Sequence, residues 1–129
     1  MNISEQELKI FSRQLILKDF NEKNFEFIQR QNVIIIGMGG IGCPVAQYLI
    51  STGVKNLTLI DNDTVQLSNL NRQILFNKND LGKKKVAIAR KKLLAINTKN
   101  NIKAISKIIK EKNISKYLSN ASLVIDTTD

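Results

Sequence analysis

The fold is decided by one stretch of the sequence, Asn32-Val33-Ile34-Ile35-Ile36-Gly37-Met38-Gly39-Gly40-Ile41-Gly42. Its first half predicts a fully buried strand, because four β-branched apolar residues follow one another. Its second half matches G-x-G-x-x-G, and a helix is predicted from about Gly40 to Ser51. Glycines in this setting permit a tight turn and let a phosphate approach the backbone N–H groups at the helix start. The glycines expected to line such a nucleotide loop are Gly37, Gly39, Gly40 and Gly42.

Strands and helices alternate along the rest of the chain. Further strands are predicted at Leu57–Ile60, Asn101–Ser106 and Leu123–Ile125. Helices are predicted from Ser4 with a capping box to Glu7, and at Glu22–Arg30, Lys84–Ile96 and Ile114–Leu118, the last capped by Asn113. This order indicates an α/β fold, a Rossmann-like doubly wound parallel sheet with right-handed crossovers. We expect one domain over residues 1–129, with N-terminal helices in 1–31 and the nucleotide-binding part in 32–129.

Bulk properties narrow the class of protein. The chain has 129 residues and ends directly after a predicted strand, so we expect the sheet to be incomplete at its C-terminus. No apolar run approaches the ~18 residues of a membrane span, and no signal peptide is evident, which predicts a cytoplasmic protein without a membrane partner. The single cysteine, Cys43, fits a reducing compartment, and we interpret it as a packing residue. The net charge is +9, and Lys83 to Lys116 holds twelve basic residues and one acidic residue. That stretch is compatible with a surface for RNA or for an acidic protein, or with a solvated helix face.

A carboxylate follows the second predicted strand at the position of a ribose ligand. Asp61 lies nineteen residues after Gly42, near the spacing at which an acidic residue binds ribose hydroxyls. This much suits an NAD- or FAD-binding oxidoreductase equally well. The polar segment from Asp61 to Lys83, which we expect to be a loop with a short helical turn, adds a second acid at Asp63. A triphosphate needs cations, and the candidates are Arg13, Arg72 and Lys85.

Six blocks of sequence in register resemble the ThiF/MoeB/HesA family, the bacterial relatives of ubiquitin-activating enzymes. The resemblance covers essentially the whole chain and is more specific than any single motif. The blocks are Phe11–Gln14, Gly37–Gly42, Leu59–Asp63, Ser68–Gln73, Gly82–Val86 and Asp126–Asp129.

The resemblance implies a role for each matching residue. Asp61 would bind the ribose of ATP, with Asp63 close to the site and Asp126 merely ending a strand. Ser68, Asn69 and Arg72 would contact the phosphates, and Lys85 would reach the same anion. Arg13 would act across a homodimer interface in the partner's site, and Asp129 would hold Mg²⁺ or shape the phosphate end of the site.

The activity implied is ATP-dependent adenylation of a C-terminal glycine carboxylate. The acceptor would be a ubiquitin-like sulfur-carrier protein of the ThiS or MoaD type, in thiamine or molybdopterin biosynthesis. A catalytic cysteine and Zn²⁺ ligands, common in the family, would lie in a C-terminal part that this sequence does not contain. Three alternatives stay open: a tRNA-modifying dehydratase of the same family, an NAD/FAD-binding oxidoreductase, and a non-catalytic nucleotide-binding fragment.

Overall fold

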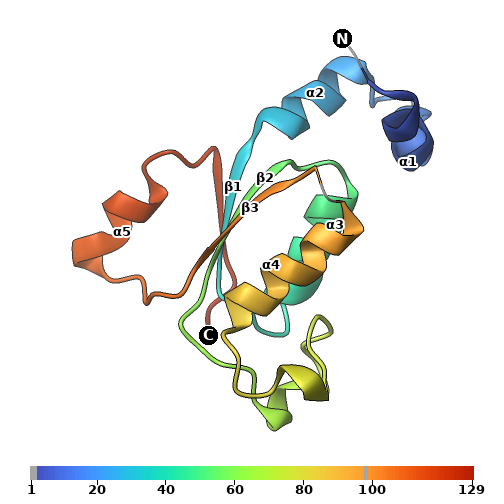
Figure 1. Cartoon of the computed structure of the whole chain (residues 1–129). Coiled ribbons are helices and arrows are strands. Elements are labelled where there is room, and N and C mark those ends of the chain that lie inside the picture. The colour runs from blue at the N-terminus through green and yellow to red at the C-terminus, as the bar shows by residue number, and fades with distance from the viewer. Residues whose placement is uncertain (1–2, 98) are drawn as a thin grey trace.

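A four-stranded parallel sheet forms the centre of the molecule (Figure 1). The structure is a computed structural model, and it describes residues 3–97 and 99–129. The strands lie in the order β3-β2-β1-β4. They are β1 (Asn32–Ile36), β2 (Asn56–Ile60), β3 (Asn101–Ile105) and β4 (Leu123–Asp126). In this order the connections from β1 to β2 and from β2 to β3 each join neighbouring strands. The connection from β3 to β4 runs from one edge of the sheet to the other. The predicted α/β class and parallel sheet are confirmed.

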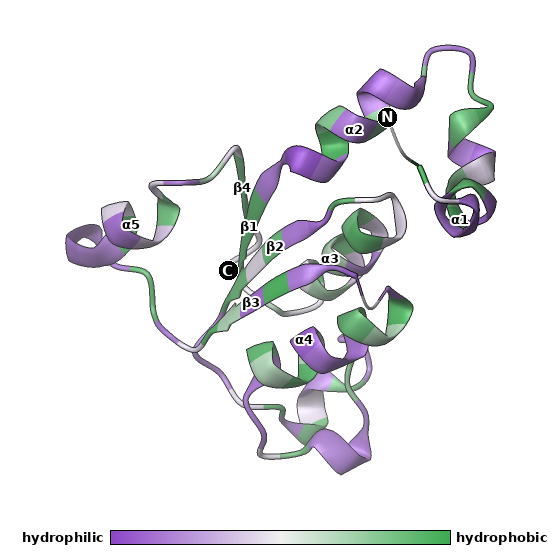
Figure 2. Cartoon of the chain, turned by 45° about the horizontal axis from the view of Figure 1, so that its top comes forward, coloured by the Kyte–Doolittle hydropathy of each residue, from purple (hydrophilic) through white to green (hydrophobic). Residues whose placement is uncertain are grey.

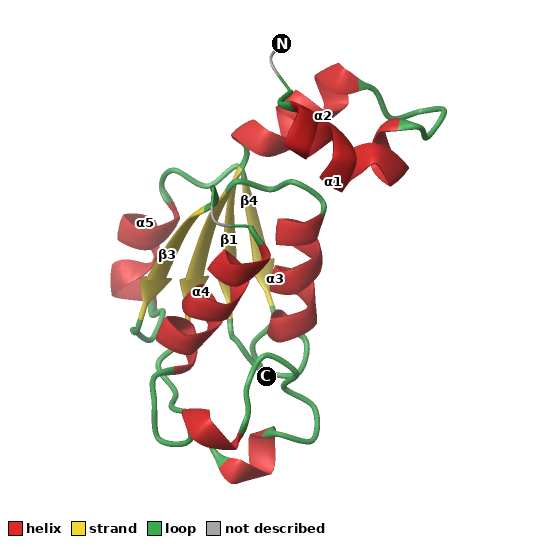
Figure 3. Cartoon of the chain, turned by 45° about the vertical axis from the view of Figure 1, so that its right-hand side comes forward, coloured by secondary structure: helices red, strands yellow, loops and turns green. Residues whose placement is uncertain are grey.

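Helices lie on both faces of the sheet, with α3 (Gly42–Ser51) and α4 (Lys85–Ile96) on one face and α5 (Glu111–Leu118) on the other (Figure 3). The strands point toward the loops that follow β1, β2 and β3, so these loops meet at one end of the sheet. The opposite end carries α1 (Glu5–Leu15) and α2 (Glu22–Arg30). Within the described ranges, no helix combines the length and apolar character that a membrane crossing requires.

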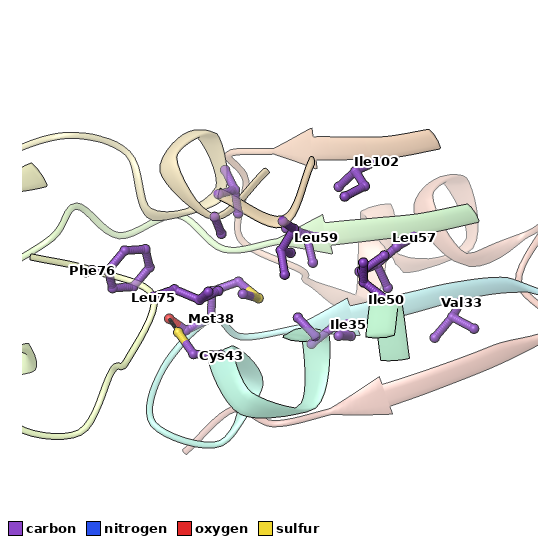
Figure 4. Packing of buried hydrophobic residues seen from close by; sticks show 14 of the residues in the cluster. Val33, Ile35, Met38, Cys43, Ile50, Leu57, Leu59, Leu75, Phe76 and Ile102 are labelled. Atoms are coloured by element: carbon purple, nitrogen blue, oxygen red, sulfur yellow. Dashed lines mark hydrogen bonds between the residues drawn. The ribbon is translucent and has the colours of Figure 1, made fainter. Parts of the chain in front are cut away.

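The hydrophobic core lies between the sheet and the pair α3 and α4. Alternate strand residues face this layer, because successive side chains of a strand point to opposite sides. Ile35, Leu59 and Leu93 are completely buried in it. Figure 4 shows Ile35 and Leu59 of the sheet in one cluster with Ile50 of α3. The first strand is therefore buried at its centre as predicted, although Asn32 is exposed and Ile36 half-buried.

The two N-terminal helices pack against the C-terminal end of α3. The predicted capping box of α1 is present, with the Ser4 hydroxyl accepting the Glu7 N–H and the Glu7 carboxylate accepting the Ser4 N–H. Phe11 of α1 and Phe25 of α2 are buried, and their ring centroids lie 4.7 Å apart. Gly53, with φ of 105°, leaves room for the Phe25 ring, which a Cβ at that position would meet at 2.6 Å.

Three details differ from the prediction. Helix α3 begins at Gly42 and not at Gly40, because the glycines up to Gly40 are used in the turn. Helix α5 begins at Glu111, so Asn113 is not its N-cap; the Asn113 side chain instead accepts the Lys110 N–H from within the first turn. The long loop after β2 contains two 3-10 turns and not one, at Leu67–Asn69 and Lys78–Asp80.

Candidate functional site

A cleft of about 500 Å³ opens at the carboxyl ends of the parallel strands. Ligands of open α/β sheets bind at this edge, where neighbouring crossovers leave the sheet on opposite sides. The structure brings together at this cleft residues that are far apart in the sequence. The predicted site residues that line it are Gly37, Gly39, Gly40, Asp61, Asp63, Arg72, Lys85 and Asp129.

The glycine turn owes its shape to two close approaches. Gly37 has φ of 94°, and a Cβ there would lie 3.0 Å from the carbonyl of Thr127. Gly42 is buried beneath the turn, where a Cβ would lie only 2.0 Å from the Gly37 oxygen. Gly42 therefore closes the turn and does not line the cleft. The turn leads directly into α3, whose N-terminal N–H groups carry a partial positive charge suited to an anion.

Asp61 fastens the turn to the end of β2. One of its carboxylate oxygens accepts the N–H of Met38, and the other accepts the N–H of Asp63, both at 2.7 Å. Two backbone donors thus fix the orientation of this carboxylate at the cleft wall. Each carboxylate oxygen has a further lone pair, so the group keeps the capacity to accept hydroxyl groups of a ligand.

Lys85 reaches the cleft from the start of α4. Its N–H donates to the carbonyl of Asp63 at 3.0 Å, and its ammonium lies 3.4 Å from the Asp63 carboxylate. Lys85 is 5% exposed, whereas the carboxylate of Asp63 is largely in solvent. A β-bridge between Thr64 and Lys84 closes the base of the intervening loop. The structure therefore places a buried cation at the cleft with a single exposed acid as its ion-pair partner.

Arg72 lies over the glycine turn. A Cβ on Gly40 would come within 3.4 Å of the Arg72 Cγ, so this glycine makes room for the arginine side chain. The guanidinium donates to the carbonyl of Ser68 and to the Asn71 side chain, both at 2.9 Å. It is held by its own turn in a position facing the cleft.

Ser68 and Asn69 do not line the cleft. Ser68 is exposed, and its carbonyl accepts from Arg72. The Asn69 side chain accepts the Gln66 N–H at 2.9 Å, which stabilises the local 3-10 turn. In this structure both residues support Arg72, and their contact with phosphates stays a prediction.

Apolar residues that follow Arg72 anchor its loop to the glycine turn. Leu75 and Phe76 are buried in one cluster with Met38 and Cys43 (Figure 4). Burial raises the pKa of the Cys43 thiol to about 11, and the thiol donates to the Met38 carbonyl at 3.5 Å. The interpretation of Cys43 as a packing residue is confirmed.

The remaining predicted residues lie at the chain ends. Arg13 is exposed on α1, at the opposite end of the sheet from the cleft, so its action in a partner's site stays a prediction (Figure 3). Asp126 ends β4 as expected, and hydrogen bonds from the Thr128 hydroxyl and N–H lower the pKa of its carboxyl. Thr127 donates from its hydroxyl to the carbonyls of Ile36 and Gly37, which ties this segment to the glycine turn.

Several lining residues escaped prediction. Gln73 and Thr127 belong to two of the six sequence blocks, so the predicted site residues beside them could have indicated that they line the cleft. Lys107, Ile108 and Ile109 follow β3 without any motif, and only the topology places them at the cleft. The further unpredicted lining residues include Asn62 and Thr128.

The cleft carries both signs of charge. Arg72, Lys85 and Lys107 line it together with the three carboxylates of Asp61, Asp63 and Asp129. Across residues 3–97 and 99–129 there is no group of three metal-ligating side chains. Mg²⁺ in phosphate sites needs only one or two carboxylates besides the phosphate oxygens, so Asp129 is compatible with this ion. The cationic side chains and the N–H groups at the start of α3 are available to phosphate oxygens.

The parallel sheet, the glycine turn and the cleft at the strand ends define a Rossmann-like α/β domain. A profile of the ThiF family matches residues 11–129. The chain belongs to the ThiF family.

Known relatives share this domain. The molybdopterin-synthase adenylyltransferase of Escherichia coli is 40% identical over 127 residues, which cover 98% of this chain and 51% of the relative. The sulfur carrier protein adenylyltransferase of Thermus thermophilus is 34% identical and covers 100% of this chain and 48% of the relative. The chain thus spans about half the length of the curated relatives that it matches.

Solved structures agree with the sequence comparison. The E. coli tRNA N6-threonylcarbamoyladenosine dehydratase TcdA, crystallised with ATP, superposes with a TM-score of 0.92 at 28% identity. The superposition covers 100% of this chain and 53% of that structure. The same dehydratase has also been crystallised with AMP.

Proposed function

We propose that this chain forms the ATP site of an adenylyltransferase that activates the C-terminal glycine carboxylate of a ubiquitin-like sulfur-carrier protein. One observation carries the proposal: Arg72 and Lys85, from separate segments, line the same cleft as the glycine turn and Asp61. The relatives named as molybdopterin-synthase and sulfur carrier protein adenylyltransferases support this substrate class.

The residues of the cleft suit adenylation because the reaction requires alignment and charge stabilisation more than covalent chemistry. A carboxylate oxygen attacks the α-phosphorus of ATP while the bond to the oxygen that bridges to the β-phosphorus breaks. Pyrophosphate leaves with that electron pair, and an acyl-adenylate remains. A carboxylate is ionised near neutral pH and needs no general base, which agrees with a chain that has no histidine.

Each part of the cleft then has a task. Asp61, held by two backbone donors, orients the ribose, and the glycine turn and the helix start receive a phosphate. Arg72 and Lys85 neutralise charge that spreads over the phosphate oxygens during transfer. When bound, Mg²⁺ would sit against Asp129 and phosphate oxygens, and it would supply charge neutralisation.

The test is ATP–pyrophosphate exchange in the presence of a sulfur-carrier protein. We expect exchange that depends on the carrier, and a loss of about 100-fold or more in Arg72→Ala, by analogy with the removal of one oxyanion donor. Arg30→Ala is the matched control, because Arg30 is an exposed arginine on α2 outside the cleft. Exchange that survives in Arg72→Ala at the control level would remove the proposed role of the cleft.

We also propose that Arg13 completes the site of a partner copy in a homodimer. Its exposure at the end of the sheet opposite to the cleft supports action in another subunit. Mixing inactive Arg13→Ala and Arg72→Ala chains should restore one intact site per heterodimer. Activity no higher than that of either variant alone would contradict this arrangement.

A second candidate, the tRNA-modifying dehydratase, is supported by the superposition with TcdA over the whole chain. The twelve basic residues from Lys83 to Lys116 would suit an RNA phosphate backbone. Affinity for tRNA that falls steeply with salt, without carrier-dependent exchange, would favour this alternative. Stronger binding of NAD than of ATP would instead favour an oxidoreductase.

A further inference from the structure

Gln73 is a buried amide whose oxygen is left without a hydrogen-bond partner by the protein. The residue is 4% exposed and lines the cleft. Its Oε1 has no hydrogen-bond partner within the described residues. Two other buried polar atoms share this property, on Asn100 and Ser106, but neither residue lines the cleft. A buried polar group without a partner costs free energy, and natural proteins keep few of them. Because Oε1 is an acceptor, acceptor oxygens of a ligand cannot satisfy it, so a reason other than stability for keeping this amide at the cleft must lie with its donor end, Nε2.

The order of contacts along the glycine turn supplies that reason. Met38 is bound by Asp61, which faces the ribose under the proposed function. The next residue, Gly39, faces Gln73, whose Nε2 would lie 3.6 Å from a Cβ at that position. The residue after that, Gly40, faces Arg72. The phosphate attached to the ribose is the α-phosphate, so it would occupy the part of the turn between the Asp61 and Arg72 contacts.

We propose that the Gln73 amide is a substrate-binding group that donates a hydrogen bond to the α-phosphate of the nucleotide. The proposal rests on the proposed function, and it assigns to this neutral side chain the phosphorus at which the acyl-phosphate bond forms. The amide end of glutamine has a broad torsional range, so Nε2 can turn toward a phosphate oxygen without moving the backbone. The backbone is fixed, since the Gln73 N–H donates to the Asn69 carbonyl at 2.9 Å.

A binding role and a packing role make opposite predictions for stability. Methionine fills a similar volume and has no amide, so Gln73→Met removes the unsatisfied oxygen. If Gln73 binds the ligand, the unliganded variant should melt at the same temperature as wild type or higher. If Gln73 holds the turn, the variant should melt at a lower temperature. Replacing a buried unpaired polar group by an apolar one of the same shape is neutral or stabilising.

The experiment measures the melting temperature and the calorimetric affinities for ATP, AMP and adenosine. We expect Gln73→Met to weaken ATP and AMP about tenfold or more and to leave adenosine unchanged, because only the phosphate contact is lost. Gln73→Glu, which puts a carboxylate in place of the donor, should weaken AMP further. Gln66→Met is the matched control, since Gln66 lies in the same loop, is exposed and lies outside the cleft lining.

The outcomes separate the two proposals. Wild type that binds ATP and AMP, with Gln73→Met unchanged in affinity, overturns the role of Gln73 alone. Equal losses for adenosine and AMP, or loss of the folded state in both Gln73 variants, also overturn it, because they indicate a structural role. Wild type that binds neither ATP nor AMP overturns the proposed function and this inference together.

Discussion

The two faces of the sheet differ in how completely helices cover them. The face toward α3 and α4 is covered by these helices, and Ile35 and Leu59 on it have no exposed surface. On the face toward α5, Ile34 and Ile60 of the central strands are buried. Thr58 is half-buried there, Lys103 on the edge strand is exposed, and α5 itself has no buried residue. Hydropathy follows the same division, with hydrophilic segments dominating α5 (Figure 2). The strands are the same for both faces, so the difference arises from alternate residues and not from the sheet.

The cleft is lined by segments from both the α3 and α4 side and the α5 side of the sheet. The glycine turn, Asp61, Lys85 and the Arg72 loop are joined to the covered face by the buried cluster of Met38, Leu75 and Phe76. Lys107, Ile108 and Ile109 come from the connection to α5, on the sparsely packed side. The charged groups expected to align phosphates thus belong to the rigid side, as alignment requires.

The largest expected difference between the faces is in core truncation. Leu59→Ala should lower the free energy of unfolding by about 2–5 kcal/mol, because it empties a fully buried site. Val124 lies on β4 facing the α5 side and is 37% exposed, so Val124→Ala should cost about 1 kcal/mol or less. Urea denaturation of both variants measures the difference. Similar losses would break the comparison between the faces.

The glycine turn should come next in magnitude. Gly42→Ala places a Cβ 2.0 Å from the Gly37 oxygen, so the turn must shift, at a cost of about 1–3 kcal/mol. Gly82→Ala is the control: Gly82 has φ of 77° but nothing within 4 Å of an added Cβ. It should cost only the left-handed backbone strain of about 1 kcal/mol. Urea denaturation measures the unfolding free energy of both variants. Equal losses would show that the turn accommodates a Cβ at Gly42 with little cost.

The sequence predicts the elements on the α3 and α4 side of the sheet better than those on the α5 side. The β1 strand, its glycine turn and Asp61 were predictable because local chemistry and structure coincide there: an unbroken run of β-branched apolar residues, a glycine with positive φ, and an acid at a strand end. The start of α5 was not, because Asn113 caps from within the helix and its sequence position misled. Lys107 lies at the cleft because of the sheet topology, which depends on contacts between distant residues and leaves no local pattern in the sequence. Gln73 lies within the Ser68–Gln73 block, but its burial at the cleft follows from packing that the block does not reveal.

A smaller effect is expected where α1 joins the covered side. Hydrogen bonds from the Ser4 N–H and hydroxyl, with help from Lys55, lower the pKa of the Glu7 carboxyl from 4.5 to about 2. Because the folded pKa is depressed, the stabilisation is complete above pH 4.5 and is lost as the pH falls toward about 2. Losing the cap should cost about 1 kcal/mol. The unfolding free energy of Glu7→Gln should therefore depend less on pH in this window than that of wild type, with Glu5→Gln, at an exposed site in the same turn, as the control.

The smallest effect is expected on α5. Ile114 is 39% exposed although it is one of the few apolar side chains of this helix, so Ile114→Ala should change the unfolding free energy by about 0.5 kcal/mol or less. The amides of α5 should also exchange with solvent faster than those of α4, because helices with few buried contacts open locally at low free energy. Leu93→Ala on α4, at a fully buried position, provides the contrasting variant. Slow exchange in α5 together with a large cost for Ile114→Ala would mean that the open face is packed as firmly as the covered one, and the division of the cleft into a rigid and a loose side would fail.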